Sequence, residues 1–407
     1  MVRTSIASRL FHATAHLAAC VALACTPFTL LANNGNGNGN GNGNGNNGSS
    51  SNVYNWVGSP WYNGWSQGSN WAGGTAPPSQ YDDPAAANTI MNFGTGTSSF
   101  NDGWIHTQKE IHFLDSLGNS TYTINNNSSV KIFKFTNAPV ISVDHTGTAI
   151  INSGVDFQEN ILITGNNGGT LNINGAINKG WQWEPVAPTG GITKEGNSTL
   201  ILSGSESNKL NSLTIENGTV VLNKTGGATA ASGNISINGG TLLLASSNQI
   251  ADNTTMNLNG GTFATAGNSE RLGTLTLSSS STIDLGQSGT VNFADSSGTS
   301  WSGSLVITNW SGDSSGEGNG FSQIYFGTDA SSLTADQLNS ITFVNPDGYS
   351  PGIYGAKLLD NGQLVPFSSF SVIPEPSTVM GGILMTLGAA FLGWRQWRKS
   401  RVADPHS

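Results

Sequence analysis

The chain has 407 residues, and charged residues make up only 10% of it, against about 25% in a typical domain. Without residues 1–32 and 374–407, it keeps 9 basic and 22 acidic residues, a net charge of −13. That balance excludes the basic surface on which nucleic-acid binding depends. Thr, Val and Ile suit strands, while Gly, Asn and Ser suit turns. The composition therefore predicts an all-β fold.

Residues 1–32 have the pattern of a secretory signal peptide. They begin with Arg3 and Arg9, continue with an apolar run, and offer small residues at 22–24 and 30–32 as cleavage sites. We therefore expect the protein to be exported and signal peptidase to remove this segment.

Both cysteines of the chain, Cys20 and Cys25, lie in the same segment. The rest of the chain therefore has no disulfide, no thiol nucleophile and no cysteine ligand for a metal. Residues 17–20 read Leu-Ala-Ala-Cys, which also resembles a lipoprotein box. Lipidation of Cys20 stays open as an alternative to simple cleavage.

Two segments of unusual composition follow. Residues 33–52 are dominated by Gly and Asn, which predicts a flexible linker because such a segment buries little apolar surface. Residues 53–115 are rich in tryptophan, and two roles are open for the rings. They could close the open end of a β structure as a cap, or they could stack on sugar rings. The candidates for sugar stacking are Trp56, Trp61, Trp65 and Trp71.

Residues 116–300 contain a repeat of about 21 residues that is most regular at 191–290. Its strands align on threonines spaced 20, 22, 21 and 20 residues apart: Thr199, Thr219, Thr241, Thr262 and Thr282. The Asn-Gly pairs between strands would also suit hairpins in a sandwich. The fixed period instead favours the rungs of a right-handed parallel β-helix, or solenoid. The apolar residue after each threonine should then form an inward row: Leu200, Val220, Leu242 and Phe263.

Residues 301–371 are expected to cap the other end of the solenoid. Most of this segment reads as further short strands. One short helix is predicted, with Thr334 as its N-cap and Asp336 in its first turn.

Residues 53–371 offer little that suits catalysis or metal binding. Three histidines lie there without Cys or Glu at the spacing of a metal site: His106, His112 and His145. A polysaccharide lyase or hydrolase would need acidic groups that meet across rungs. Two pairs could do so, although the repeat has no acidic row: Asp252 with Glu270, and Asp284 with Asp295. We predict no catalytic residue, no metal and no cofactor.

The tail, residues 372–401, has the composition of a membrane-spanning segment. No charge occurs from Pro376 through Trp394, and a helix over 377–394 would be about 27 Å long, close to the thickness of a hydrocarbon core. The basic residues that follow favour a cytoplasmic C-terminus; they are Arg395, Arg398, Lys399 and Arg401.

The triplet Pro374-Glu375-Pro376, the short apolar helix and the basic cluster together resemble the PEP-CTERM sorting signal of Gram-negative bacteria. This resemblance implies that an exosortase recognises the triplet, removes the tail, and releases or re-attaches the body at the cell surface. It also implies that the protein resides in the inner membrane only transiently. A permanent C-terminal anchor is the alternative.

The stretch "ITKEGNSTLILSG", with the strands after it, resembles the autotransporter-associated β-strand repeat of bacterial surface proteins. The usual Lys-Thr-Gly of that repeat reads Lys194-Glu195-Gly196 in this chain. The resemblance covers about 100 residues, from Gly191 to Gly286, and implies a surface-exposed solenoid.

These features predict a non-enzymatic protein of the cell surface or of an exopolysaccharide matrix. A glycan-binding module that uses the tryptophan-rich segment is one alternative. A β-helix polysaccharide lyase or hydrolase is the other.

Overall fold

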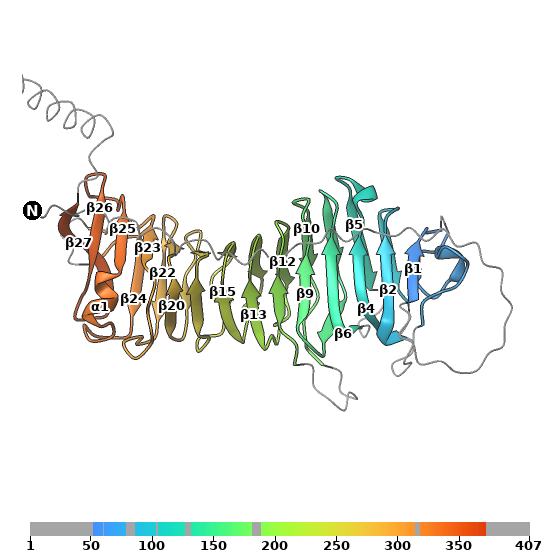
Figure 1. The fold of residues 1–407 in the computed structure, drawn as a ribbon, viewed down its shortest axis with the longest axis horizontal. Coiled ribbons are helices and arrows are strands. Elements are labelled where there is room, and N and C mark those ends of the chain that lie inside the picture. The colour runs from blue at the N-terminus through green and yellow to red at the C-terminus, as the bar shows by residue number, and fades with distance from the viewer. Residues whose placement is uncertain are drawn as a thin grey trace, which may run out of the picture. The chain divides into compact units, whose positions relative to one another are not determined.

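The computed structural model describes residues 52–59, 61–78, 86–102, 105–126, 132–180, 189–313 and 318–371. The chain divides into two units, Met1–Gly48 and Ser49–Ser407, and all the described residues belong to the second. Strands dominate them, which confirms the predicted all-β class (Figure 1). The strands form two long sheets that are mostly parallel, an arrangement consistent with the predicted solenoid. The predicted right hand of its coil stays a prediction.

Sheet 1 is parallel throughout, with β8 (Gly154–Phe157) as a side branch on β6. Its strands follow one another in this order: β1 (Asn52–Trp56), β2 (Thr89–Phe93), β4 (Ile105–Phe113), β6 (Ile132–Val143), β9 (Ile161–Thr164), β11 (Ile192–Lys194), β13 (Ser212–Ile215), β15 (Asn234–Ile237), β17 (Met256–Asn259) and β20 (Leu275–Ser279).

Sheet 2 runs beside it, and its first eleven strands are its parallel part. The parallel part is β3 (Ser98–Asn101), β5 (Thr121–Asn126), β7 (Thr148–Ile151), β10 (Thr170–Ile173), β12 (Thr199–Gly204), β14 (Thr219–Lys224), β16 (Thr241–Leu244), β18 (Thr262–Ala264), β21 (Ser281–Asp284), β23 (Leu305–Thr308) and β25 (Ile341–Val344). The order then continues through β26 (Ile353–Leu358), β27 (Gln363–Ser371), β24 (Ser322–Phe326), β22 (Gly289–Phe293) and β19 (Glu270–Arg271). β26 and β27 are inserted between β25 and β24 by antiparallel pairing, and the other strands pair in parallel.

The chain alternates between the two sheets from β9 to β18 and adds one parallel strand to each in every repeat. The register matches the alignment predicted from the sequence, because Thr199, Thr219 and Thr241 are direct partners. The Asn217-Gly218 turn links β13 to β14. Gly218 has a φ of +74°, and a Cβ there would lie 2.5 Å from the carbonyl oxygen of Gly196 in the preceding turn. Only glycine fits this stacked turn.

The core lies between the sheets and consists of stacked apolar rows. Alternate residues of each strand point inward, and the predicted row of Leu200, Val220, Leu242 and Phe263 is fully buried. Its members are register partners from strand to strand. This part of the sequence prediction is confirmed.

The N-terminal end is closed by residues 57–78. The Trp65 amide donates to the Phe100 carbonyl on the edge of sheet 2 (3.2 Å), and the Ala72 amide donates to the Asn55 carbonyl on the edge of sheet 1 (2.8 Å). The segment therefore covers edge strands of both sheets, which would otherwise expose unpaired backbone groups. Three single-turn helices lie in the N-terminal region: Gly68–Asn70, Ala86–Asn88 and Asp115–Leu117.

The C-terminal end is closed differently, by antiparallel strands. β26 pairs antiparallel with β25 and with β27, and β27 pairs antiparallel with β24. The predicted helix is α1 (Ala335–Asn339), and Thr334 and Gln337 form a reciprocal capping box at its start. No helix among the described residues is long and apolar enough to cross a membrane. The helix predicted at 377–394 lies outside those residues.

Candidate functional site

The outer face of sheet 2 carries a continuous row of threonines. In each strand the residue next to an inward apolar residue points outward, and threonine fills that position in eight consecutive strands. The row consists of Thr121, Thr148, Thr170, Thr199, Thr219, Thr241, Thr262 and Thr282. Neighbouring strands lie about 4.8 Å apart, so the hydroxyl and methyl groups repeat at that interval. We call this set the threonine row.

A second outward row lies two residues further along the same strands. It consists of Thr123, Ile150, Asn172, Ile201, Val221, Leu243, Ala264 and Asp284. The two rows together have no ionisable side chain before Asp284. A third line is formed by amides: Asn152 donates to Asn125 (2.9 Å) and Asn174 donates to Asn152 (3.1 Å).

Hydroxyls both donate and accept hydrogen bonds, while the methyl groups and the aliphatic row offer flat apolar contact. The outer face of sheet 2 is thus suited to contact with a neutral partner that carries hydroxyl groups at regular intervals. It gives no electrostatic attraction for an ionic ligand.

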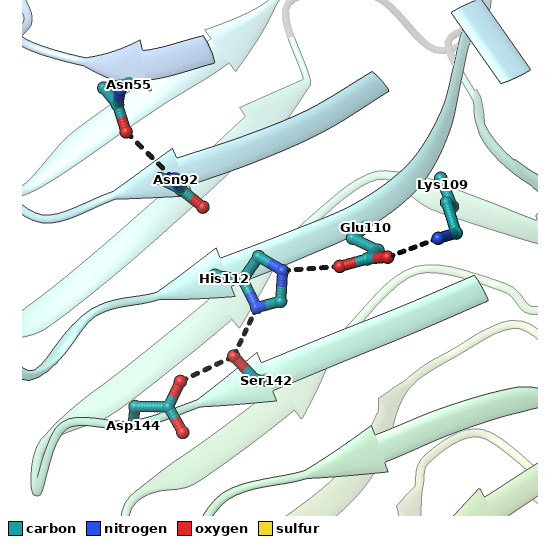
Figure 2. A network of polar contacts seen from close by, with 7 residues as sticks. All are labelled: Asn55, Asn92, Lys109, Glu110, His112, Ser142 and Asp144. Carbon is teal, nitrogen blue, oxygen red and sulfur yellow. Dashed lines mark hydrogen bonds and ion pairs between the residues drawn. The ribbon is translucent and has the colours of Figure 1, made fainter. Parts of the chain in front are cut away.

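The outer face of sheet 1 is different and carries a polar network near the N-terminal end (Figure 2). Glu110 and His112 lie on β4, and Ser142 lies opposite His112 on β6. The Glu110 carboxylate contacts Lys109 Nζ at 2.8 Å and His112 Nε2 at 2.9 Å. His112 Nδ1 lies 2.7 Å from Ser142 Oγ, and that hydroxyl donates to Asp144 Oδ2 at 2.7 Å.

Ser142, His112 and Glu110 are the residue types of a hydrolytic triad. The hydrogen bond of the serine hydroxyl, however, points in the opposite direction. A nucleophilic serine gives its proton to the histidine. Here the Ser142 hydroxyl donates to Asp144, so its oxygen accepts from His112. The other ring nitrogen of His112, Nε2, contacts the Glu110 carboxylate. The contact between His112 on β4 and Ser142 on β6 links the two strands.

The electrostatics of Glu110 follow from the same contacts. The hydrogen bond from His112 lowers the pKa of Glu110 to about 2, and burial opposes this effect, while the hydrogen bond from Lys109 adds to it. Glu110 is therefore ionised across the physiological range. This region is a paired ionic network on the outer face of sheet 1.

Two lysines lie inside the stack. Lys194 occupies an inward position between Ile163 and Ile215, and its amine donates to the carbonyl oxygens of Glu195 (2.5 Å) and Gly196 (3.1 Å). The Lys224 amine donates to a carbonyl oxygen at 3.2 Å. Burial lowers the pKa of each lysine to about 8. Shifted pKa values often mark active sites, but these amines hold backbone turns.

Glu270 on β19 is the remaining strongly perturbed carboxyl. Burial raises its pKa to about 7, although the backbone amides of Gln249 (2.7 Å) and Ile250 (3.2 Å) donate to it. The charge of Asp252 contributes a further increase in the pKa of Glu270. The Glu270 carboxyl is engaged by the backbone of the neighbouring turn, which is a structural role.

The tryptophans differ from the sugar-stacking prediction. Trp56, Trp65 and Trp71 are buried, with 3%, 0% and 1% of their surface exposed, whereas Trp61 is 92% exposed. Trp65 stacks on Phe133 with 5.0 Å between ring centroids, and Trp71 Nε1 donates to the Trp65 carbonyl. A glycan cannot reach the three buried rings, because they fill the end of the core. Their burial favours the capping interpretation, and sugar stacking remains a prediction for Trp61 alone.

The other predicted candidates stay apart. His106 lies on β4, His112 belongs to the network above, and His145 is buried with its ring 6.3 Å from that of Phe113. Asp284 accepts from Asn309, whereas Asp295 accepts from Ser297. Within the part of the chain that the structure describes, no three His, Cys, Asp or Glu residues gather as a metal site would require.

Sequence reasoning missed two features of these faces. The threonine row extends to Thr121, Thr148 and Thr170, where insertions between strands hide the period. The His112–Ser142 contact joins residues 30 apart in a region without a regular repeat. The alternation within each strand was the available signal for the first feature, and no sequence signal indicated the second.

Comparison with known families bears on the tail. Residues 372–399 match the PEP-CTERM protein-sorting motif. The match includes Pro374, Glu375, Pro376, Arg395, Arg398 and Lys399, and Arg401 follows two residues after its end. The motif implies an exported protein that is processed by an exosortase and located at the surface or outside the cell.

Searches of curated proteins and of solved structures found no match. The resemblance to autotransporter-associated repeats stays a prediction. All the sorting residues lie outside the described part of the chain.

Proposed function

We propose that the protein is a non-enzymatic component of the cell surface or exopolysaccharide matrix, and that the outer face of sheet 2 binds neutral glycan chains. The threonine row carries this proposal. It offers eight hydroxyls at a regular interval beside a row of aliphatic and amide side chains, with no charge before Asp284. Linear glycans likewise repeat hydroxyls along their length, so one chain can form the same contact at many rungs.

The proposal includes the route to the surface. Signal peptidase removes residues 1–32, the helix at 377–394 holds the chain in the inner membrane for a time, and an exosortase acts at Pro374–Pro376. The sorting motif at 372–399 supports the last step. The body reaches the outside with a net charge of −13, which favours solubility and disfavours anionic partners.

A non-enzymatic role agrees with the chemistry of the perturbed groups. Lys194 binds backbone carbonyls of the turn that follows it, and Lys224 and Glu270 bind backbone atoms of neighbouring turns. Ser142 donates its proton away from His112. Each of these groups is engaged in holding the stack, and none is poised as a nucleophile or general base.

The proposed glycan contact is tested by removing hydroxyls without changing shape. Valine keeps the branched Cβ of threonine and removes its oxygen, so the triple variant Thr199→Val, Thr219→Val, Thr241→Val should fold normally. We expect its retention on immobilised exopolysaccharide of the host to fall at least tenfold. The matched control, Thr193→Val, Thr214→Val and Ser236→Ala on sheet 1, should bind as the wild type does. Equal retention of both variants would contradict the proposal.

Trp61 supports a second candidate for the same activity. It is 92% exposed, and the nearby Tyr62 is 45% exposed with its hydroxyl donating to Asp102 at 3.1 Å. Exposed aromatic rings of this kind contact the apolar faces of sugars. If Trp61→Ala abolishes retention while the threonine variant does not, glycan binding belongs to the N-terminal end.

Catalysis is tested separately. The purified protein should release no product from a panel of polysaccharides. New reducing ends would indicate a hydrolase and unsaturated ends a lyase, and either would overturn the non-enzymatic assignment.

A further inference from the structure

A groove lies on the C-terminal end between α1, β25, β26 and β27. Its volume is about 650 Å³, and most of its lining is apolar. The residues that matter here are Leu338 on α1, Ile353 and Lys357 on β26, and Phe367 on β27. Phe367 leaves 49% of its surface exposed, which is unusual for a phenylalanine in this molecule. The volume of this groove lies within the range of ligand-binding pockets, and the exposed ring of Phe367 adds apolar surface to it.

The sorting motif begins beside this groove. β27 runs antiparallel to β26 and ends at Ser371, the register partner of Ile353, which lines the groove. The matched motif starts at the next residue, 372. A hydrogen-bonded strand thus connects the tail to the groove. A short connection of this kind gives the tail an effective concentration near the groove in the millimolar range.

The chemistry of the tail fits the groove. Val379 follows Ser371 by eight residues, and a chain of that length spans at most about 29 Å. The residues that follow the Pro374-Glu375-Pro376 triplet can therefore reach β26 and β27. These residues are uncharged and largely apolar, and residues 379–384 read Val-Met-Gly-Gly-Ile-Leu.

We propose that the groove binds residues 379–384 of the same chain until the tail enters the membrane. The contact covers apolar side chains of the tail and of Phe367 that would otherwise face water. A helix over 377–394 would be about 27 Å long, so the groove holds only its beginning. The body therefore shields the first residues of its own sorting helix from water during export. These residues leave the groove when the helix inserts into the membrane.

The test uses the full chain with Cys20→Ser and Cys25→Ser, so that only introduced thiols react. Met380→Cys is combined with Lys357→Cys in the groove, and disulfide formation is followed by mass spectrometry after addition of diamide. The matched control combines Met380→Cys with Lys209→Cys, which also removes a lysine but lies in the stack, where its side chain is exposed. We expect the groove pair to form its disulfide at least tenfold faster, at a rate independent of protein concentration.

Two further measurements make the result decisive. Phe367→Ser should slow the groove pair severalfold, whereas Phe321→Ser, an exposed phenylalanine outside the groove lining, should leave its rate unchanged. Addition of phospholipid vesicles should slow the groove pair as the tail inserts. Equal rates for the groove and control pairs would overturn the proposal. A rate proportional to protein concentration would also overturn it, because the occupant would then be the tail of a second copy.

Discussion

The two outer faces of the stack are built on the same backbone, yet they carry different chemistry. Sheet 1 bears an ionic network in which Glu110 contacts both Lys109 and His112. Sheet 2 bears a threonine row and a neutral second row over seven strands, from Thr121 to Ala264. In a parallel stack, every side chain has a neighbour about 4.8 Å away on each side. A charge is therefore tolerated where its partner is adjacent, and excluded where the same position repeats.

This difference teaches that neutrality on sheet 2 has two possible causes. It could prevent repulsion between stacked charges, or it could serve the binding of a neutral partner. Serine, asparagine or alternating charges would also satisfy the first requirement. The branched Cβ of threonine also suits strands, so the first cause needs no ligand. The second cause corresponds to the glycan contact that we propose.

The largest expected effect separates these two causes. Thr199→Glu, Thr219→Glu and Thr241→Glu together place three carboxylates in line, and each adjacent pair costs about 1 kcal/mol or more at this spacing. Urea unfolding at pH 7 should show a loss of about 2 kcal/mol or more, which disappears at pH 3, where the carboxylates are protonated. The variant Thr199→Glu, Thr219→Lys, Thr241→Glu should be nearly as stable as the wild type. Both should lose glycan retention, and retention by the alternating variant would favour repulsion as the sole cause.

A smaller effect is expected from the network on sheet 1. His112→Ala leaves Ser142 and Glu110 each without one hydrogen-bond partner, which should lower the free energy of unfolding by about 1 kcal/mol. Thr123→Ala on the neighbouring strand of sheet 2 should change it by less than about 0.5 kcal/mol. Urea denaturation at pH 7 measures both. Equal losses would mean that the ionic network contributes nothing special to the stack.

The third effect is a pH dependence of stability that belongs to sheet 1. Glu110 has a pKa of about 2 in the folded chain, against its ordinary value of 4.5. Its ionised form therefore stabilises the fold above pH 4.5, and this contribution is lost as the pH falls from 4.5 toward 2. Glu110→Gln should make the urea midpoint less sensitive to pH between 6 and 3. An unchanged pH dependence would show that other carboxyl groups account for acid destabilisation.

The regular part of the fold could be predicted from the sequence because its physical basis is local. Period-two alternation places Leu200 and Leu202 inside, and a fixed spacing of about 21 residues brings Thr199, Thr219 and Thr241 into register. The N-cap at Thr334, with Asp336 in the first turn of α1, follows equally from a few consecutive residues. Each of these predictions depends on short-range pattern alone.

The remaining features depend on contacts that pattern does not encode. Trp56, Trp65 and Trp71 lie close together along the chain. Whether their rings face the core or the solvent depends on how residues 57–78 cross the end of the stack. The antiparallel closure by β26 and β27 replaces the parallel pairing of the repeats, and strand direction is not written in the alternation of apolar and polar residues. The direction of the hydrogen bond from the Ser142 hydroxyl depends on Asp144, two residues away, which accepts that hydrogen bond.

The one-strand-per-repeat register has a consequence for how such a body can change its length. Removal of residues 219–240 would take out one strand of each sheet and bring Thr241 beside Thr199, with the inward rows still aligned. Duplication of the same segment would lengthen the threonine row by one hydroxyl. The two closed ends would be untouched, because they contact only their nearest strands. Whole-repeat insertions and deletions would therefore change the length of the threonine row while the fold of the remaining repeats stays the same.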